Sequence, residues 1–205
     1  MDELIILGVS RYGRVIADAV ICAKGHLVGF LDGAYASEEN TDGLILGKLE
    51  DASRFGGQGR GFIIAERDIT KREHLVKVYE GLCFSSVIHP GAMVASDAVI
   101  GEGTYIGAGA VVGTHAHIGA HVIIGDGAVI GDYAVIDDFC HIMARVNIGS
   151  GVSVGDKTFI GLSATLKDDI KIAPKTVIQT GEIVVKDMVM KMVYKRGAWI
   201  YKENG

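Results

Sequence analysis

The sequence predicts a mainly β fold, in which a parallel β-helix built from a hexapeptide repeat follows a small Rossmann-like α/β domain. Two observations support this prediction. From Ile88 to Val184 every sixth residue is aliphatic, without a break. Before residue 85 this period is absent, and apolar stretches typical of strands alternate with stretches typical of helices.

The sixfold period defines the β-helix. A helical pattern repeats near 3.6 residues and a simple strand pattern every 2, so neither explains a period of six, whereas a hexapeptide β-helix does. The aliphatic positions are Ile88, Val94, Ile100, Ile106, Val112, Ile118, Ile124, Ile130, Ile136, Ile142, Ile148, Val154, Ile160, Leu166, Ile172, Ile178 and Val184. Glycine often comes directly after the aliphatic residue, and a small residue usually stands four positions after it.

Each six-residue unit forms one flat side of a coil, and three sides close a coil of eighteen residues. The aliphatic and small side chains point into the core, and glycine permits the backbone to turn. Successive coils pair as parallel strands about 4.8 Å apart. Residues 88–184 provide a little over five coils. No single coil buries its own aliphatic residues, so the stack is the stabilising unit.

The chain divides into three expected segments: residues 1–85 form the α/β domain, residues 86–187 the β-helix, and residues 188–205 a C-terminal cap or tail. Strands are expected at residues 4–7, 26–31, 61–65 and 84–88, and a polar loop at residues 35–42. One helix is expected between Gly13 and Gly25, and another over 69–83 with Asp68 as its N-cap. Residues 185–192 are expected to close the open end of the solenoid as a strand or a short helix.

The segment Gly8-Val9-Ser10-Arg11-Tyr12-Gly13 follows a predicted strand and opens a predicted helix, and Asp32 lies nineteen residues beyond Gly13. This arrangement resembles a dinucleotide fingerprint, but Ser10 replaces the middle glycine and impedes the close approach of a pyrophosphate. The loop therefore favours a nucleotide sugar or a similar anion at the helix N-terminus over NAD. The alternative is a tight turn that only packs the helix on the strand.

Composition narrows the class of protein. The net charge is −5, from 20 basic and 25 acidic side chains, without a basic run, which argues against nucleic acid as a partner. Three cysteines without a CxxC pair suggest reduced thiols in a cytoplasmic protein. The N-terminal apolar run is short, so neither a signal peptide nor a membrane span is expected.

These features together resemble the hexapeptide-repeat sugar O- and N-acetyltransferases of the sialic-acid O-acetyltransferase type, which include UDP-4-amino-sugar and GDP-perosamine N-acetyltransferases. The resemblance covers essentially the whole chain. It depends on the opening strand, Gly8 and the helix that follows, on the strand end Phe30-Leu31-Asp32, on the segment Val87-Ile88-His89-Pro90, and on the repeat itself.

The resemblance implies a left-handed β-helix and a homotrimer, with acetyl-CoA or another acyl-CoA between neighbouring helices and no metal. It implies that the N-terminal domain binds a nucleotide-linked sugar, for which the candidate residues are those of the loop and the strand end: Gly8, Ser10, Arg11, Tyr12, Gly13 and Asp32. A His acts as general base toward the amine or hydroxyl, a carboxylate orients that His, and backbone N–H groups stabilise the oxyanion. The implied pathway is surface polysaccharide synthesis.

The chain departs from the family at the base. Where the family carries His followed by a carboxylate, this chain carries Asp132 and Tyr133. The family's second His, which contacts the acyl-CoA near its thioester, is present as His141. An ionised Asp is a weak base for an ammonium. Three interpretations follow. His141 takes over as the general base with Asp132 orienting it, or the acceptor differs and needs little help from a general base. In the third, the site is catalytically inactive and retains only ligand binding.

Further histidines stand nearby in the repeat. His115 is eighteen residues before Tyr133 and therefore one coil away on the same column, which makes it another candidate base. His117 and His121 are expected on the solvated face of the β-helix. No histidine trio has the spacing of the hexapeptide carbonic anhydrases, so no zinc site is expected. The resemblance places the pantetheine along Gly161, Ser163, Ala164 and Gly181, where the repeat also demands small residues.

Three functions remain open from the sequence. The first is an acyl-CoA-dependent sugar N- or O-acetyltransferase with His141, Asp132 and His115 as candidate catalytic residues. The second is a catalytically impaired homologue that binds a nucleotide sugar, which the missing His and carboxylate favour. The third is a scaffold in which the β-helix serves only for trimerisation, against which the N-terminal loop argues.

Overall fold

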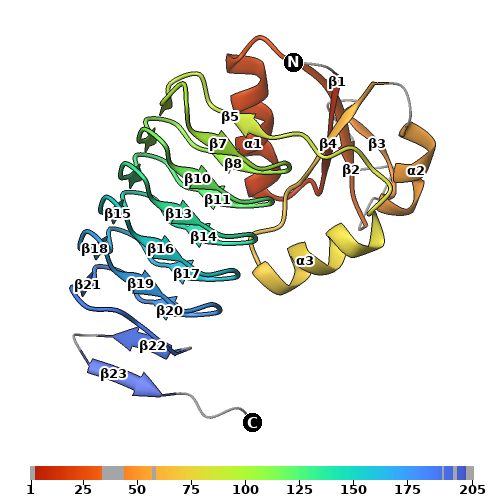
Figure 1. Ribbon diagram of the computed structural model, residues 1–205. Helices are drawn as coiled ribbons and strands as arrows, with labels where there is room; N and C mark the ends of the chain where they lie inside the picture. Colours follow the sequence, from red (N-terminus) through yellow and green to blue (C-terminus); the bar gives the residue numbers. More distant parts are fainter. Residues whose placement is uncertain (1–2, 34–43, 57–58, 191, 196–197, 202–205) are drawn as a thin grey trace. The chain divides into compact units, whose positions relative to one another are not determined.

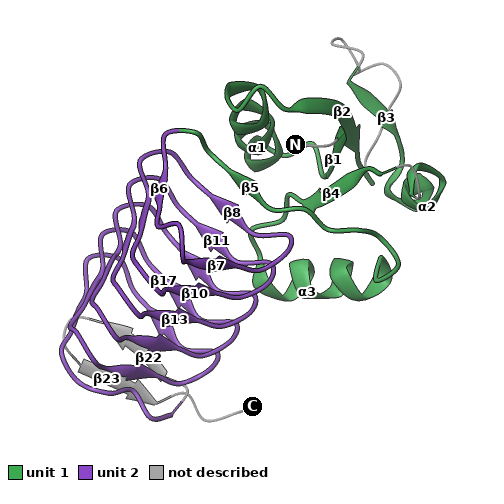
Figure 2. Cartoon of the chain, turned by 45° about the horizontal axis from the view of Figure 1, so that its top comes forward, with its two compact units in different colours: residues 1–90 green, residues 91–205 purple. Residues whose placement is uncertain are grey.

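The computed structural model describes residues 3–33, 44–56, 59–190, 192–195 and 198–201. The chain forms two compact units, residues 1–90 and residues 91–205 (Figure 2). The division falls slightly after the predicted boundary at 85/86. None of the described helices combines the length and the apolar composition needed to span a membrane.

The first unit is built on a parallel four-stranded sheet with the order β3-β2-β1-β4. Its strands are β1 (Glu3–Leu7), β2 (His26–Leu31), β3 (Ile45–Gly47) and β4 (Gly61–Ile64). Apolar side chains on these strands make a buried core that includes Ile5, Leu31 and Phe62. The carboxyl ends of parallel strands lie at one edge of a sheet, which is where α/β folds place ligands.

The helices of this unit are α1 (Arg11–Cys22), a 3₁₀ turn η2 (Leu49–Asp51), α2 (Ala52–Phe55) and α3 (Ile69–Val78). The Ser10 and Asp68 side chains cap α1 and α3 by accepting hydrogen bonds from Gly13 N and Lys71 N. Helix α3 ends at Val78 rather than at the predicted residue 83, because the chain turns at Tyr79. The last strand, β5 (Val87–Ile88), is shorter than predicted, and only an isolated bridge joins Phe84 to Phe62. The polar loop predicted at 35–42 lies outside the described residues.

The second unit is a parallel β-helix with three faces (Figure 1). One face contains β7 (Val99–Ile100), β10 (His117–Ile118), β13 (Val135–Ile136), β16 (Ser153–Val154) and β19 (Lys171–Ile172). The next contains β6 (Met93–Val94), β9 (Val111–Val112), β12 (Val129–Ile130), β15 (Asn147–Ile148), β18 (Thr165–Leu166) and β21 (Ile183–Val184). The third contains β8 (Tyr105–Ile106), β11 (Ile123–Ile124), β14 (His141–Ile142), β17 (Phe159–Ile160) and β20 (Val177–Ile178).

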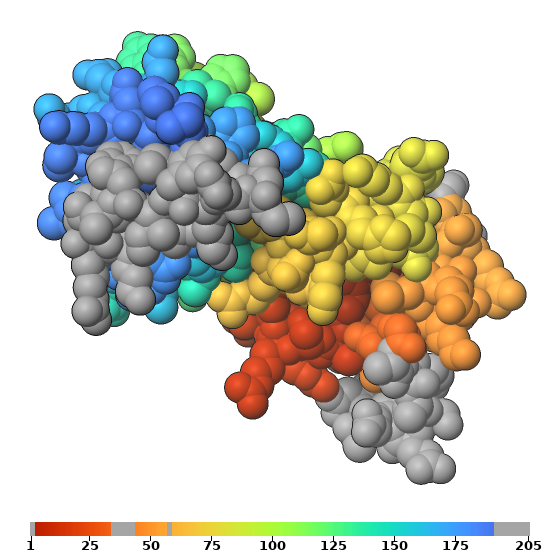
Figure 3. All heavy atoms as spheres, turned by 90° about the horizontal axis from the view of Figure 1, so that it is seen from below, coloured from red at the N-terminus to blue at the C-terminus, as the bar shows by residue number. Residues whose placement is uncertain are grey.

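Each strand pairs in parallel with the strand eighteen residues further along the chain, as His117 with Val135 and Ile118 with Ile136. The coils therefore follow one another in chain order, from green to blue in Figure 1. Seen from below, the blue coils of the β-helix lie in front of its green coils (Figure 3). The aliphatic ladder is fully buried from Ile106 onward, and the small-residue positions lie inside with it, including Ala134 and Cys140. This register explains the sixfold sequence period.

At several glycines that follow the aliphatic residue, close packing between coils leaves no room for a Cβ. A Cβ added to Gly101 would lie 2.4 Å from the carbonyl carbon of Gly119 in the next coil. At the corners, by contrast, non-glycine residues adopt the left-handed backbone conformation with φ between 54° and 60°. These corner residues are His115, His121, Tyr133, Phe139, Arg145, Lys157, Ser163, Asp169 and Lys175. Such residues seldom adopt positive φ, so the stacking imposes this conformation.

The C-terminal end extends the third face. Met188 is buried and forms an isolated bridge with Ile172. Strand β22 (Met192–Lys195) pairs in parallel with β20 and antiparallel with β23 (Ala198–Tyr201). The predicted closing element over 185–192 therefore begins as a strand only at Met192.

Candidate active site

Aspartates at the corners of the β-helix fix the turns of the preceding coil. Asp126, Asp132, Asp138 and Asp168 each accept a hydrogen bond through Oδ1 from a backbone N–H eighteen residues earlier, at 3.0, 2.9, 2.8 and 2.9 Å. The donor to Asp132 is Thr114. Asp132, which stands where the family carries its base, therefore has the same structural contact as three other corner aspartates.

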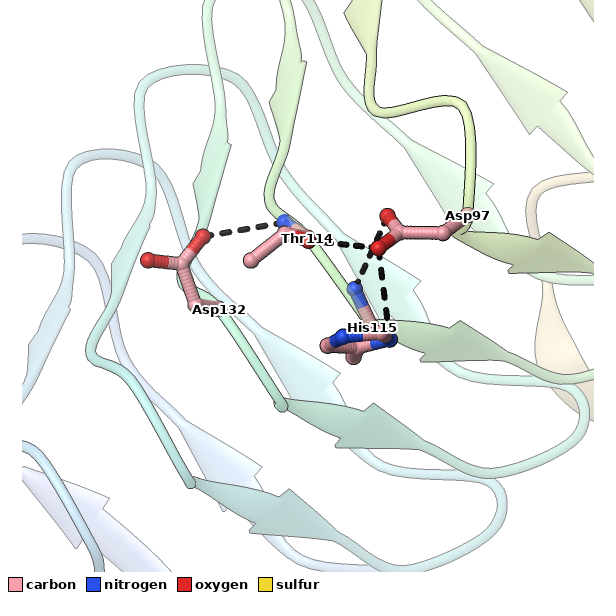
Figure 4. A network of polar contacts seen from close by, with 4 residues as sticks. All are labelled: Asp97, Thr114, His115 and Asp132. Carbon is pink, nitrogen blue, oxygen red and sulfur yellow. Dashed lines mark hydrogen bonds and ion pairs between the residues drawn. The ribbon is translucent and has the colours of Figure 1, made fainter.

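One corner holds a histidine against a carboxylate (Figure 4). The Nδ1 atom of His115 lies 3.3 Å from Oδ2 of Asp97, and the backbone N–H of His115 donates to Oδ1 of Asp97 at 3.1 Å. The hydroxyl of Thr114 donates to Oδ2 of Asp97 at 2.6 Å. Thr114 thus lies between two carboxylates: its N–H contacts Asp132 and its hydroxyl contacts Asp97.

These contacts keep Asp97 ionised. The hydrogen bond from Thr114 is the largest of the effects that hold the pKa of Asp97 below its usual value. The backbone N–H of His115 and the charge of its imidazole act in the same direction, and partial burial opposes them. An ionised Asp97 favours the tautomer of His115 that carries its proton on Nδ1. In that neutral imidazole, Nε2 is the nitrogen that can accept a proton.

The imidazole of His115 is both oriented and accessible. Its side chain is 53% exposed, and its ring lies 4.8 Å, centroid to centroid, from the ring of Tyr133 in the next coil. A His held in this way can take a proton from an incoming amine or hydroxyl. Asp97 was not among the residues singled out from the sequence, although the eighteen-residue coil spacing from Asp97 to His115 would have revealed the pair.

His141 lies on strand β14, between Ile123 and Phe159 of the neighbouring strands. Its side chain is buried, with 4% exposed, and meets the Phe159 ring edge-on at 5.4 Å. Asp132 lies at a corner and uses Oδ1 for Thr114 N. A general base needs access to its acceptor, so the burial of His141 makes it a weaker candidate than His115 in this chain.

The prediction that His121 lies on a solvated face is wrong. The residue is 3% exposed, because its corner position stacks the imidazole on the Phe139 ring one coil further on, at 5.3 Å between centroids. His117, on strand β10, is exposed as predicted.

The residues predicted to line the pantetheine lie along one corner of successive coils. Ser163 adopts φ 55° and Gly181 φ 72°, and the N–H of Gly181 donates to Leu162 O at 2.8 Å. A Cβ on Gly161 would lie 2.5 Å from Thr180 N, so coil packing alone requires glycine there. The side chain of Ala164 is buried in the core, which leaves only its backbone for a ligand.

The first unit contains a pocket of about 330 Å³ at the N-terminus of α1. Its lining residues are Ser10, Arg11, Tyr12, Val15, Ala65, Glu66 and Arg67. Three of these were predicted from the Gly8–Gly13 loop, whereas Glu66 and Arg67 were missed. They follow strand β4, at the carboxyl edge where parallel strands place ligands. The buried guanidinium of Arg72 donates to the Glu66 and Arg67 carbonyls at 2.9 and 3.3 Å and so holds this loop.

Several predicted residues of the loop have structural contacts. Gly8 adopts φ 114°, and a Cβ on Gly13 would lie 2.2 Å from Gly8 O. Asp32 Oδ2 accepts a hydrogen bond from Val9 N at 2.6 Å, and the Ser10 hydroxyl donates to Ala65 O at 3.2 Å. These contacts fix the turn that opens α1. The loop residues that do not line the pocket therefore support those that do.

Two further clusters of titratable side chains lie outside these sites. A groove of about 460 Å³ on the β-helix is lined by Asp137, Asp138, Phe139, Asp156 and Lys157. Although Asp137 as a whole is exposed, partial burial of its carboxyl is the main cause that raises its pKa, and the charges of Asp138 and Asp156 raise it further.

In the first unit, potential metal-ligand atoms of Asp18, Cys22 and His89 lie within 4.8 Å of one another. Asp18 and Cys22 are exposed, and such surface groups are common without a bound ion.

A three-faced hexapeptide β-helix that follows a small α/β unit with a pocket defines the class of protein. The family model of the GMPPB C-terminal domain matches residues 83–193, more than half of the chain, and the chain therefore belongs to this family. The model of the PglD N-terminal domain matches residues 3–79. The predicted relationship to the hexapeptide-repeat sugar acetyltransferases is thereby confirmed. No curated protein matches this chain significantly.

Solved structures share the fold over almost the whole chain. The acetyltransferase domain of PglB from Neisseria gonorrhoeae FA1090, in complex with acetyl coenzyme A, is 21% identical with a TM-score of 0.87, covering 93% of this chain and 94% of that one. PerB from Caulobacter crescentus, in complex with CoA and GDP-perosamine, is 24% identical with a TM-score of 0.81, covering 92% and 91%. WeeI from Acinetobacter baumannii AYE is 18% identical with a TM-score of 0.82, covering 92% and 93%. The predicted left-handed β-helix after a small α/β domain is confirmed.

Proposed function

We propose that this protein transfers an acyl group, in the simplest case acetyl, from acyl-CoA to an amino or hydroxyl group of a nucleotide-linked sugar, for glycan synthesis. The observation that carries the proposal is the pocket at the N-terminus of α1, flanked by Arg11 and Arg67, in a chain whose other unit is a hexapeptide β-helix. It acts as a homotrimer in the cytoplasm, where acyl-CoA and nucleotide sugars are available.

The pocket suits the anionic part of a nucleotide sugar. The N-terminus of a helix offers unpaired N–H groups and a positive partial charge to a phosphate. The guanidinium groups of Arg11 and Arg67 can bind phosphate oxygens in a bidentate manner. The pocket volume of about 330 Å³ is at the lower end for small-molecule sites, which fits part of a nucleotide rather than a dinucleotide.

The β-helix supplies the acyl-CoA site in this proposal. Structural neighbours are complexes with acetyl coenzyme A and with CoA. The corner formed by Gly161, Ser163, Ala164 and Gly181 offers backbone groups to the pantetheine, and the family resemblance implies that His141 lies near the thioester. The acidic groove around Asp137 and Asp156 repels phosphates and is therefore excluded from the path of the CoA phosphates.

The transfer needs no covalent enzyme intermediate. The lone pair of the acceptor attacks the thioester carbonyl, the new C–N or C–O bond forms, and the C–S bond breaks. The acceptor proton goes to a general base and from there to the leaving CoA thiolate. No metal takes part in this chemistry.

The alternative function is a catalytically impaired homologue that only binds a nucleotide sugar. The contact of Asp132 with Thr114 N favours it, because it gives Asp132 a structural reason to be present that is independent of catalysis.

One assay separates the two functions. CoA thiol release is measured with acetyl-CoA and a panel of UDP-, dTDP- and GDP-linked amino and hydroxyl sugars, while calorimetry measures the binding of each sugar. Turnover with at least one sugar supports the transferase. Binding without turnover across the panel supports the binding protein, and neither binding nor turnover contradicts both. Light scattering of the same sample tests the trimer.

A further inference from the structure

We propose that the general base of this transfer is His115, positioned by Asp97, and that the base has moved by one coil from the corner that carries Asp132. This inference rests on the proposed acyl transfer. It assigns Asp97, which the sequence did not single out, as a positioning residue. It also makes Asp132 a turn contact.

The first step concerns Asp132. Its Oδ1 accepts the Thr114 N–H at 2.9 Å, as Asp126 and Asp168 accept backbone N–H groups from Ala108 and Ser150 at other corners. The matching corner of the coil before carries no histidine in those two cases, whereas the corner of the coil before Asp138 carries the buried His121. The contact forms in both cases, so it is a property of the repeat rather than of a site. A carboxylate is also too weak a base for an ammonium near neutral pH.

The second step concerns the orientation of His115. Asp97 accepts hydrogen bonds from the Thr114 hydroxyl and from the His115 backbone N–H, and His115 Nδ1 lies 3.3 Å from its Oδ2. The carboxylate is therefore fixed before it contacts the imidazole. When the proton of the neutral imidazole is on Nδ1, facing Asp97, Nε2 carries the lone pair that accepts a proton.

The third step concerns position. The His115 ring contacts the ring of Tyr133, which directly follows Asp132, so the imidazole leans toward the corner of the next coil. Figure 4 shows His115 and Asp132 joined through the Thr114 segment. Neighbouring coils are about 4.8 Å apart, so a base one coil away can reach a substrate that is bound along the same corner.

In the reaction, Nε2 of His115 takes the proton from the attacking amine or hydroxyl as the bond to the thioester carbon forms. The C–S bond breaks, and the resulting imidazolium returns the proton to the CoA thiolate. Asp97 stabilises the imidazolium and gains no proton itself. Atoms and charges balance without a further reactant.

The test uses the full chain with acetyl-CoA and the sugar that turns over. His115 has φ 54°, so two variants that tolerate this conformation are chosen: His115→Asn and His115→Gly. We expect both to lower kcat by about 100-fold or more, with the KM for acetyl-CoA unchanged. Free imidazole should restore activity to His115→Gly, which leaves room for it, and not to His115→Asn. Asp97→Asn should lower kcat by about 10- to 100-fold through loss of orientation.

Matched controls exclude a structural explanation. His117→Ala removes an exposed histidine two residues away, and Asp126→Asn changes an aspartate with the same turn contact as Asp132. Both controls should keep wild-type kcat. Thermal unfolding verifies that each variant is folded.

The possible failures are distinguishable. An active wild type with an active His115→Asn overturns this inference and leaves the proposed function standing. Loss of activity in His141→Ala together with full activity in the His115 variants assigns the base to His141 and also overturns it. Absence of wild-type turnover across the whole sugar panel overturns the proposed function, and the base assignment with it.

Discussion

The carboxylate of Asp132 accepts a hydrogen bond from the backbone N–H of Thr114, one coil earlier, at 2.9 Å. Asp168 makes the same contact with Ser150. We expect Asp132→Ala to lower the free energy of unfolding by about 1 kcal/mol, which is typical for a lost hydrogen bond. Asp168→Ala should lower it by a similar amount. Denaturant unfolding checks this, and a much larger effect at Asp132 than at Asp168 would contradict an equivalent role.

The hydrogen bonds to Asp97 also predict a pH dependence of stability. Because the pKa of Asp97 is lowered in the folded state, its contribution is present above the pKa of the unfolded chain and is lost as pH falls through the folded pKa. Asp97→Asn should therefore lower Tm near pH 7, and the difference from wild type should vanish in acid. Thermal unfolding over a pH series measures it. A difference that stays constant into acid would show that charge is not the cause.

Asp137 predicts the opposite trend. Burial and the carboxylates of Asp138 and Asp156 raise its pKa, so the ionised group destabilises the fold at neutral pH. The penalty disappears as pH falls below the usual range of an aspartate, because the group is then protonated in both states. Asp137→Asn should thus raise Tm at pH 7 and have little effect in acid. An unchanged Tm at pH 7 would refute the prediction.

The turn before α1 should not tolerate a side chain at Gly13. A Cβ there would lie 2.2 Å from Gly8 O, and backbone must shift to relieve it. We expect Gly13→Ala to destabilise the protein by about 1–3 kcal/mol. Gly81→Ala is the matched control, because a Cβ at Gly81 meets nothing within 4 Å. Equal unfolding midpoints for the two variants would show that the turn adapts.

The pocket in the first unit makes a prediction for substrate binding. Arg67→Ala should raise the Kd of the nucleotide sugar by about 10- to 100-fold, as expected for a lost charged hydrogen bond, and leave acetyl-CoA binding unchanged. Arg54→Ala serves as the control, because Arg54 is exposed on α2 and pairs with Asp51. Calorimetry measures both, and an effect of equal size at Arg54 would point to net charge rather than to the pocket.

The sequence allowed the β-helix to be predicted almost residue by residue, because its period is local. Each two-residue strand ends at an aliphatic of the ladder, as at Ile118 and Ile136. The strands β1 and β2 and the cap Asp68 were predicted for the same reason, since apolar runs and capping residues are adjacent in sequence. Strand β3 and helix α2 were missed, because three or four residues carry no detectable period.

The candidate site was only partly predictable. The loop at Ser10 was visible as a motif, but Arg67 joins it through the order of strands in the sheet, which the chain order alone does not give. His115 was found from the coil spacing, yet its partner Asp97 depends on which side chains meet across a corner. The burial of His121 depends on ring stacking with Phe139, which cannot be deduced from the position of His121 in the repeat.

The corners of the β-helix keep the same left-handed backbone whether they carry His115, Tyr133, Lys157 or Ser163. The backbone conformation of a corner is therefore independent of the side chain that the corner carries. A functional group can therefore lie one coil higher or lower on such a solenoid while the backbone of the scaffold stays unchanged. Homologues of this architecture should accordingly be compared by the corner or face on which a residue lies and by the coil that carries it, rather than by aligned position alone.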